Sequence, residues 1–244
     1  MPRFFVSKDN ISEGKITITD ADAHHIARSL RMAEGDAITI SDGEGTDYSC
    51  TLTKIRDDVC ECEIVESATA KTESPIYITL FMAYPKGDKL EVIIQKAVEL
   101  GASKIVPFES SRCIKRPKAE KAEKQTVRLA RIAREAAKQC GRSRIPTVEE
   151  PVSFSEMLSL AKKSDLSLFC YENEDKRSLR DELSEREKPS SIAVIVGSEG
   201  GFSDEEARLI TNEGVVPISL GTRILRCETA PSYVLASISY QYEL

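Results

Sequence analysis

Short runs of alternating apolar and polar residues dominate the first part of the chain. β-branched residues at every second position indicate half-buried strands. Such strands are predicted at residues 16–18, 37–40, 48–55 and 59–65. Glycine and acidic residues separate them, and one helix is predicted from about Ala21 to Leu30, with Asp20 as its N-cap. Closely spaced strands of this kind favour a small β-barrel.

After Pro75 the pattern changes to strands that alternate with helices. Continuous apolar runs predict buried parallel strands, which are expected at residues 76–82, 104–108, 166–170, 192–196 and 215–220. Apolar residues at helical spacing predict a helix between Asp88, its N-cap, and Gly101. Two further helices are expected over residues 119–140 and 230–240. We therefore predict an α/β fold with two domains, at residues 1–72 and 73–244.

Composition excludes several classes of protein. With 41% hydrophobic and 30% charged residues, the chain has a globular balance, and no apolar run approaches the roughly 20 residues that cross a bilayer. The start lacks the pattern of a signal peptide, and seven cysteines without a CxxC pair suit reduced thiols, so we expect a cytoplasmic protein. Cys60 and Cys62 lack the spacing of common zinc ligands and are expected in the core, with no metal bound.

The net charge of −6 conceals a basic block at residues 104–144, where 13 Lys and Arg face 4 Asp and Glu. The helix over 119–140 would place several of these cations near one face. They are Lys124, Arg128, Arg131, Lys138 and Arg142. Such a row can neutralise RNA phosphates without reading the base sequence. A solvated helix face explains the charge equally well, so charge alone leaves both interpretations open.

A glycine-rich loop follows the predicted strand at 192–196, with the sequence Gly197-Ser198-Glu199-Gly200-Gly201. Glycines at this position let a ligand approach the backbone, although a plain strand-to-helix turn is the alternative. The spacing is not GxGxxG, and Ser203 with Glu206 predicts a capping box at the next helix. Acidic residues in that first turn disfavour a phosphate. A nucleoside that has no phosphate and carries a positive charge, such as S-adenosylmethionine, fits better.

A second loop follows the next predicted strand, from Leu220 to Pro231. Both loops leave the carboxyl ends of parallel strands, where ligands collect in open α/β sheets, so we expect them to face one pocket. The loop offers Arg226 and Glu228, although an Arg–Glu pair by itself is often only a salt bridge.

Taken together, the two loops resemble the signature of the RsmE family, which are SPOUT-class methyltransferases that act on small-subunit (16S) ribosomal RNA. The resemblance covers essentially the whole chain. It includes Pro2-Arg3-Phe4-Phe5, residues 25–32, Lys86-Gly87-Asp88-Lys89, residues 95–101 and Gln139-Cys140-Gly141-Arg142. It implies a PUA-like β-barrel, a SPOUT α/β domain with a trefoil knot, a homodimer, S-adenosylmethionine as donor and N3 of a uridine as target. Ser198 departs from a frequent Pro, and Cys227 and Ala230 each depart from a frequent Thr.

The resemblance also assigns roles to individual residues. The predicted donor-binding residues are Tyr171, Gly197, Ser198, Glu199, Gly200, Gly201, Leu220, Gly221, Ile224, Leu225 and Thr229. Arg226 is predicted to stabilise a uracil anion, and Glu228 either accepts the proton, orients Arg226 or makes a subunit contact. The predicted RNA-binding residues are Arg3, His25, Arg28, Arg31, Arg128, Arg131, Lys138, Arg142 and Arg144.

Two alternatives belong to other functional classes. A nucleotide-dependent oxidoreductase on a Rossmann sheet would bind a nicotinamide cofactor, which the acidic helix start after Ser203 disfavours. A non-catalytic RNA-binding assembly factor would keep the basic helix but would have no use for the two glycine-containing loops.

Overall fold

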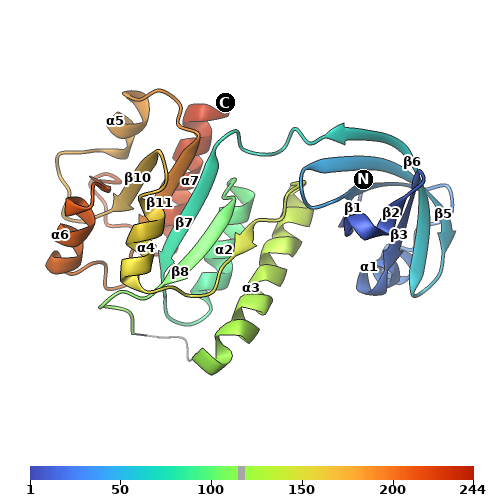
Figure 1. Ribbon diagram of the computed structural model, residues 1–244, viewed down its shortest axis with the longest axis horizontal. Helices are drawn as coiled ribbons and strands as arrows, with labels where there is room; N and C mark the ends of the chain where they lie inside the picture. The colour runs from blue at the N-terminus through green and yellow to red at the C-terminus, as the bar shows by residue number, and fades with distance from the viewer. Residues whose placement is uncertain (115–118) are drawn as a thin grey trace. The chain divides into compact units, whose positions relative to one another are not determined.

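The computed structural model describes residues 1–114 and 119–244, so residues 115–118 of the predicted basic block lie outside the described part. The chain divides into two compact units (Figure 1). The first consists of Met1–Glu73 with Ala137–Ile145, and the second of Ser74–Ala136 with Pro146–Leu244. The division therefore begins close to the predicted boundary. The two consecutive domains predicted above did not include the return of Ala137–Ile145 to the first unit.

The first unit is built on a six-stranded mixed sheet in the order β1-β4-β5-β6-β3-β2. Its elements are β1 (Arg3–Phe5), a 3₁₀ turn (Lys8–Asn10), β2 (Ile11–Ser12), β3 (Lys15–Thr19), α1 (Asp20–His24), β4 (Ala37–Ser41), β5 (Thr46–Ile55) and β6 (Val59–Thr69). β1 pairs with β4 in parallel, and the other pairs are antiparallel. The four predicted strands are present, whereas β1 and β2 are too short to give a periodic signal. β1 and β2 form the two edges of this sheet, which curls into a half-barrel and so confirms the predicted small barrel-like β domain.

Alternation along the strands produces the core of this unit. Ile16, Ile18, Cys60 and Cys62 are all fully buried, which confirms that the two thiols belong to the core. The predicted helix at 21–30 is divided into α1 and a π-helical turn, His25–Ser29. Asp20 is not its N-cap: Thr19 holds that position in extended conformation, and Asp20 is the first helical residue, with φ of +58°.

The second unit has a six-stranded, fully parallel sheet in the order β12-β10-β11-β7-β8-β9. Its strands are β7 (Tyr77–Ala83), β8 (Lys104–Phe108), β9 (Thr147–Val148), β10 (Leu166–Cys170), β11 (Ser191–Val196) and β12 (Val216–Ile218). Its helices are α2 (Lys89–Glu99), α3 (Ala119–Cys140), α4 (Phe154–Ala161), α5 (Leu179–Ser184), α6 (Asp204–Asn212) and α7 (Thr229–Tyr242). Figure 1 shows α4 in front of this sheet and α2 and α7 behind it, so the predicted α/β class is confirmed.

Local sequence explains these elements. The apolar stripe of α2 is buried, and Gly101 follows its C-cap, Leu100, with φ of +89°.

Within the described residues, no helix has the length and apolar character needed to span a membrane. The trefoil knot stays a prediction, because strand order and register do not specify whether the chain passes through its own loop.

The parallel sheet determines where a site can form. β7, β10, β11 and β12 point the same way, so the segments that follow them all start at one edge of the sheet. Both glycine-containing loops leave this edge, as does the Lys86–Lys89 segment that leads into α2. Ligands of open α/β sheets bind at such an edge.

Candidate functional site

A pocket of about 450 Å³ lies at the carboxyl ends of β10, β11 and β12. Its size is that of a small-molecule site. Ten of the eleven predicted donor-binding residues line it, together with Arg226 and Glu228; the ten are Tyr171, Gly197, Ser198, Glu199, Gly200, Gly201, Leu220, Gly221, Ile224 and Leu225. Thr229 does not line the pocket. It begins α7 instead, and its N–H donates to the carbonyl of Arg226 at 2.8 Å.

Sequence reasoning missed other residues of the wall. These are Lys89, Cys170, Glu172, Val196, Ile218, Ser219, Thr222, Arg223, Cys227 and Ala230. Most of these ten residues lie within one or two positions of a predicted residue, so a prediction with slightly longer loops would have included them. Lys89 comes from a different element, α2. The available signal was its place just after β7, a strand whose carboxyl end lies at the same edge as the two loops.

The glycine-rich loop is held in place from the helix that follows it. The predicted capping box is present: the Ser203 hydroxyl accepts from the Glu206 N–H at 3.2 Å, and the Glu206 carboxylate accepts from the Ser203 N–H at 2.9 Å. The second oxygen of the buried Glu206 accepts from the Ser111 N–H at 2.6 Å. The Arg112 guanidinium donates to the Gly200 carbonyl at 2.9 Å. The loop is thus preorganised by contacts outside the pocket.

Space and unpaired polar atoms test whether a nucleoside fits. At Gly200 an added Cβ would lie 3.0 Å from the Cβ of Arg112, closer than nearly all real Cβ contacts, so Arg112 or the loop would have to give way. Ser198 is 6% exposed, and its buried hydroxyl has no hydrogen-bond partner among the described residues. An unpaired buried hydroxyl costs about 1–3 kcal/mol. A ligand with hydroxyl and amino groups would relieve that cost, so the pocket fits a nucleoside-type donor.

A charged cluster joins the two loops. The Lys89 ammonium lies 3.0 Å from Oε1 of Glu199 and 3.2 Å from Oε2 of Glu228. The Cys227 thiol donates to the same Glu228 oxygen at 3.2 Å. Glu228 therefore contacts Lys89 and Cys227, and the predicted orientation of Arg226 by Glu228 is not what the structure has.

The ionisation of the cluster follows from these contacts. Burial opposes ionisation of Glu228, but its hydrogen bonds, including those from Cys227 and Lys89, outweigh burial and lower its pKa. The same balance lowers the pKa of Glu199, to which Lys89 and the Lys86 N–H donate. Hydrogen bonds to Glu199 and Glu228 raise the pKa of Lys89. A carboxylate with a lowered pKa is a weak proton acceptor, which favours a positioning role for Glu228 over that of a base.

Arg226 is available for chemistry. Its side chain is exposed, lines the pocket and forms no ion pair with any residue in the described ranges. Its backbone carbonyl accepts from the N–H groups of Thr229 and Ala230, which fixes the turn into α7. A guanidinium held beside a pocket in this way can stabilise an anion at any working pH.

Comparison with known proteins identifies the family. The family described as RNA methyltransferase domain matches residues 72–239, and the RNA methyltransferase PUA domain matches residues 18–65. The ribosomal RNA small subunit methyltransferase E of Bacillus subtilis is 37% identical, over 100% of this chain and 98% of that protein. This chain belongs to the RsmE family. A Synechocystis protein with the same name as the Bacillus subtilis relative is 34% identical over 97% of this chain and 77% of that protein.

Solved structures agree with this RsmE assignment. A ribosomal RNA small subunit methyltransferase E from Neisseria gonorrhoeae, solved bound to S-adenosyl methionine, superposes with a TM-score of 0.87 at 32% identity, covering 99% of this chain and 98% of that one. A methyltransferase from Legionella pneumophila, in complex with the cofactor SAM, gives a TM-score of 0.86 at 30% identity, covering 98% and 96%. The first unit is thus the PUA domain of an RsmE protein, and the second is its methyltransferase domain. The oxidoreductase and assembly-factor alternatives are excluded.

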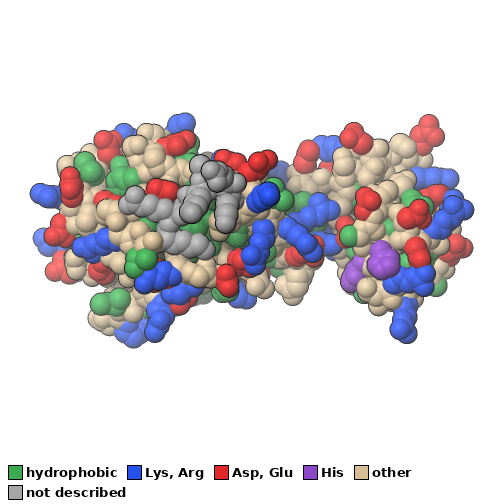
Figure 2. Space-filling view, turned by 90° about the horizontal axis from the view of Figure 1, so that it is seen from below, with side chains coloured by type: hydrophobic (Ala, Val, Ile, Leu, Met, Phe, Trp, Pro, Cys, Tyr) green, Lys and Arg blue, Asp and Glu red, His purple; other side chains and the backbone are tan. Residues whose placement is uncertain are grey.

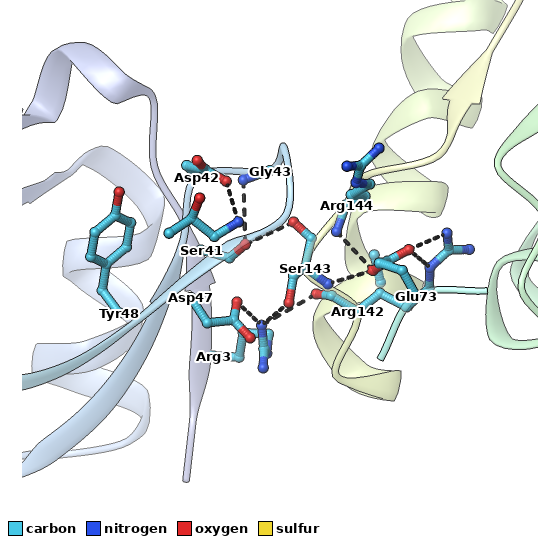
Figure 3. A network of polar contacts seen from close by, with 12 residues as sticks. Arg3, Ser41, Asp42, Gly43, Asp47, Tyr48, Glu73, Arg142, Ser143 and Arg144 are labelled. Carbon is cyan, nitrogen blue, oxygen red and sulfur yellow. Dashed lines mark hydrogen bonds and ion pairs between the residues drawn. The ribbon is translucent and has the colours of Figure 1, made fainter. Parts of the chain in front are cut away.

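Three of the nine predicted RNA-binding residues are engaged inside the PUA unit. Arg142 is 5% exposed and donates to Glu73 from Nε and Nη2, at 3.1 and 2.7 Å (Figure 3). Lys138 pairs with Asp22 at 2.7 Å and lies over the ring of Phe4. The predicted exposed row on α3 is therefore wrong beyond Arg131, because the last turn of α3 belongs to the first unit.

Arg3 is the third of these residues. It pairs with Asp47 at 2.6 Å and donates to the Ser143 hydroxyl at 2.9 Å (Figure 3). The remaining six predicted residues are exposed; they are His25, Arg28, Arg31, Arg128, Arg131 and Arg144. Figure 2 shows the two histidines side by side on the surface, with Lys and Arg side chains beside them. Arg28 pairs with Asp57, and Arg128 pairs with Glu91, at exposed positions that leave both guanidinium groups accessible.

Proposed function

We propose that this RsmE-family protein transfers a methyl group from S-adenosylmethionine to N3 of a uridine in small-subunit ribosomal RNA. The observation that carries the proposal is the pocket, in which two loops meet at the carboxyl ends of β10, β11 and β12. Close relatives are named ribosomal RNA small subunit methyltransferase E, and two solved relatives hold the methyl donor.

The donor, when bound, supplies a methyl group on a positively charged sulfur. The loops at 197–201 and 220–225 would hold it, with Tyr171 on the wall formed by the end of β10. The unpaired hydroxyl of Ser198 would hydrogen-bond to one of its polar groups. Ser198 stands where the family often has proline, so this contact is an addition of this chain.

The target nitrogen carries a proton that must leave before it becomes a good nucleophile. The site must therefore stabilise the uracil anion that results. Arg226 is proposed for this task, because its guanidinium is exposed in the pocket and offers several donors to the uracil carbonyls. Glu228 acts through its contact with Lys89, since its lowered pKa makes it a weak base.

RNA binding is proposed for the exposed cations of each unit. In the PUA unit these are Arg28, Arg31 and Arg144, with His25 beside Phe4. In the methyltransferase unit they are Arg128 and Arg131 of α3. Cations of this kind bind phosphates, and stacking platforms for single-stranded bases are few because the chain has no Trp and only 6% aromatic residues. Recognition of RNA shape is therefore favoured over reading of individual bases.

We propose a homodimer that works in the cytoplasm. Ile224 is 88% exposed, and Tyr233 and Tyr240 are exposed about two helical turns apart on α7. Exposed apolar groups of this kind support an interface in solution, and sedimentation equilibrium would measure the mass of the particle. All seven cysteines are free thiols, which supports a reducing compartment.

The test is a methylation assay on small ribosomal subunits from a strain that lacks the modification, with naked ribosomal RNA in parallel. Pure protein and methyl-labelled donor are added, and the modified base is mapped by digestion and mass spectrometry. Label on N3 of a single uridine is expected. Label on a ribose, on another base or on no RNA would overturn the proposal.

A further inference from the structure

Lys89 reaches both loops of the pocket from a third element. It is the first residue of α2, while Glu199 lies in the loop after β11 and Glu228 immediately precedes α7. Its ammonium contacts one oxygen of each carboxylate, at 3.0 and 3.2 Å. We infer that Lys89 is a positioning residue that holds the two donor-binding loops together through one ion pair shared by Glu199 and Glu228. This inference rests on the proposed function and adds a specific part of the site to it.

The bridge is specific to Lys89 in this structure. Within the described residues, no other basic side chain forms an ion pair with Glu199 or Glu228. The segment before α2 makes a second contact with the first loop, since the Lys86 N–H donates to both oxygens of Glu199, at 3.2 and 3.3 Å. Loss of Lys89 would therefore leave Glu199 attached to its neighbours but would detach Glu228 from the first loop.

The ion pair that Lys89 forms with Glu199 and Glu228 also affects the protonation of the two carboxyl groups. Each of the three side chains is about 30% exposed, so solvent screens the pair only in part. Two carboxylates share one ammonium, and without it they would repel each other across the pocket. Partial burial and a like charge both raise a carboxyl pKa. In the absence of Lys89, the two carboxyl groups would thus take up protons at a higher pH than in the intact cluster.

The other charged and titratable groups of the pocket do not replace Lys89. Burial and the Glu228 contact raise the pKa of Cys227 to about 12, so the thiol stays neutral over the range tested below. Arg223 and Arg226 of the second loop also line the pocket, but among the described residues neither forms an ion pair with Glu199 or Glu228. Glu172, after β10, is a third carboxylate on the wall. None of these groups gains a positive charge that would compensate for the missing ammonium.

The experiment measures binding of the methyl donor by calorimetry at pH 5.0 and pH 7.0. The proteins are the wild type, Lys89→Met, Lys89→Arg and the double variant Lys89→Met/Glu228→Gln. We expect the ratio of the dissociation constant at pH 5.0 to that at pH 7.0 to be higher in Lys89→Met than in the wild type by about twofold or more, the factor given by a carboxyl group that is half protonated at pH 5.0. The binding is weaker at pH 5.0, because protonated carboxyl groups no longer attract the cationic donor. Titration of the donor itself is common to all variants and cancels.

The conservative variants sharpen the test. Lys89→Arg keeps the positive charge and is expected to retain the wild-type ratio, while the double variant loses most of the added pH dependence because one carboxyl group is gone. Lys96→Met is the matched control: it removes an ion pair with Glu99 on the same helix, outside the pocket, and is expected to match the wild type. If Lys89→Met does not fold, Glu228→Gln tests the bridge with Lys89 intact. The melting temperature gained on adding donor is then expected to fall relative to the wild type.

The outcomes separate this inference from the proposed function. A wild-type ratio in Lys89→Met, or an equal change in Lys96→Met, overturns the role of Lys89 even if ribosomal RNA is methylated. If Lys89→Met does not fold, an unchanged donor-induced rise in melting temperature in Glu228→Gln overturns it as well. Donor binding with the expected ratio, but without methylation of any uridine, supports the bridge and overturns the proposed reaction. A wild-type protein that does not bind the donor overturns both.

Discussion

The Arg142 guanidinium donates from Nε and Nη2 to one oxygen of Glu73, although 69 positions separate the two residues. The other Glu73 oxygen accepts from the N–H groups of Ser143 and Arg144, at 2.8 and 3.0 Å (Figure 3). Both side chains are nearly buried, at 6% and 15% exposed. This ion pair attaches the end of α3 to the last residue of the PUA unit's first segment.

Glu73→Gln is expected to destabilise the PUA unit by about 3 kcal/mol, because it leaves the Arg142 charge buried without its partner. Hydrogen exchange of amides in β4 and β5 would measure the loss. Lys54→Gln is the control, since it removes an exposed pair with Glu61 in the same sheet and should cost at most about 1 kcal/mol. Equal losses in the two variants would contradict a special role for the buried pair.

The same carboxylate predicts a pH dependence. Burial would raise the pKa of Glu73, but the pair with Arg142 and the backbone N–H groups outweigh it, so the pKa is lowered. A lowered pKa stabilises the fold above the unfolded value of about 4.3, and this contribution is lost as the pH falls further. The stability difference between wild type and Glu73→Gln should therefore shrink on acidification below about pH 4. A stability difference that stays constant down to pH 3 would contradict a lowered pKa of Glu73.

Gly200→Val is expected to weaken binding of the methyl donor by about tenfold or more, because even a Cβ meets Arg112 and the loop must shift. Gly221→Val should have a similar effect for another reason: its φ of +107° strains any side chain, although the space around it is open. Gly214→Ala carries the same kind of strain outside the pocket, and should leave donor affinity unchanged. Calorimetric titration distinguishes these cases, and wild-type affinity in both pocket variants would place the donor elsewhere.

The double variant Arg128→Gln/Arg131→Gln should weaken RNA binding and reduce the slope of log affinity against log salt by about 0.7–0.9 per lost phosphate contact. Donor affinity should stay level. Lys162→Gln, an exposed lysine of the same unit that pairs with Glu213, serves as the control. An unchanged salt slope would show that this face of α3 is merely solvated.

Arg226→Ala should reduce methyl transfer about 100-fold, as loss of a donor to a developing anion does in other enzymes. Donor affinity should be retained. Glu228→Gln should lower the rate at every pH without moving the pH profile, because its lowered pKa and its contact with Lys89 indicate a positioning role. Single-turnover kinetics between pH 6 and 9 would measure both. A displaced profile in Glu228→Gln would restore Glu228 as the base, and wild-type turnover in Arg226→Ala would remove this loop from the chemistry.

Local patterns predicted the elements that depend on local physics. The capping box of Ser203 and Glu206 and the C-terminal glycine of α2 are present where the sequence placed them. Each depends on hydrogen bonds or backbone angles within a few residues. The two glycine-containing loops were also predicted, because parallel strands bring their carboxyl ends to a common edge. β1 and β2 escaped prediction, since strands of two or three residues are stabilised by their partners rather than by their own pattern.

The α/β class, the family and most of the pocket wall could be predicted, because strand periodicity, turn residues and loop motifs are encoded by neighbours in the chain. The partners of charged side chains could not, because they depend on how distant segments pack in the folded protein. Arg142 and Lys138 share the helical spacing of Arg128 and Arg131, yet the last turn of α3 packs into the PUA unit and there they pair with Glu73 and Asp22. Glu228 likewise pairs with Lys89, which is 139 positions away. A charge is satisfied by whichever opposite charge the fold brings within about 4 Å, and sequence spacing does not specify that distance.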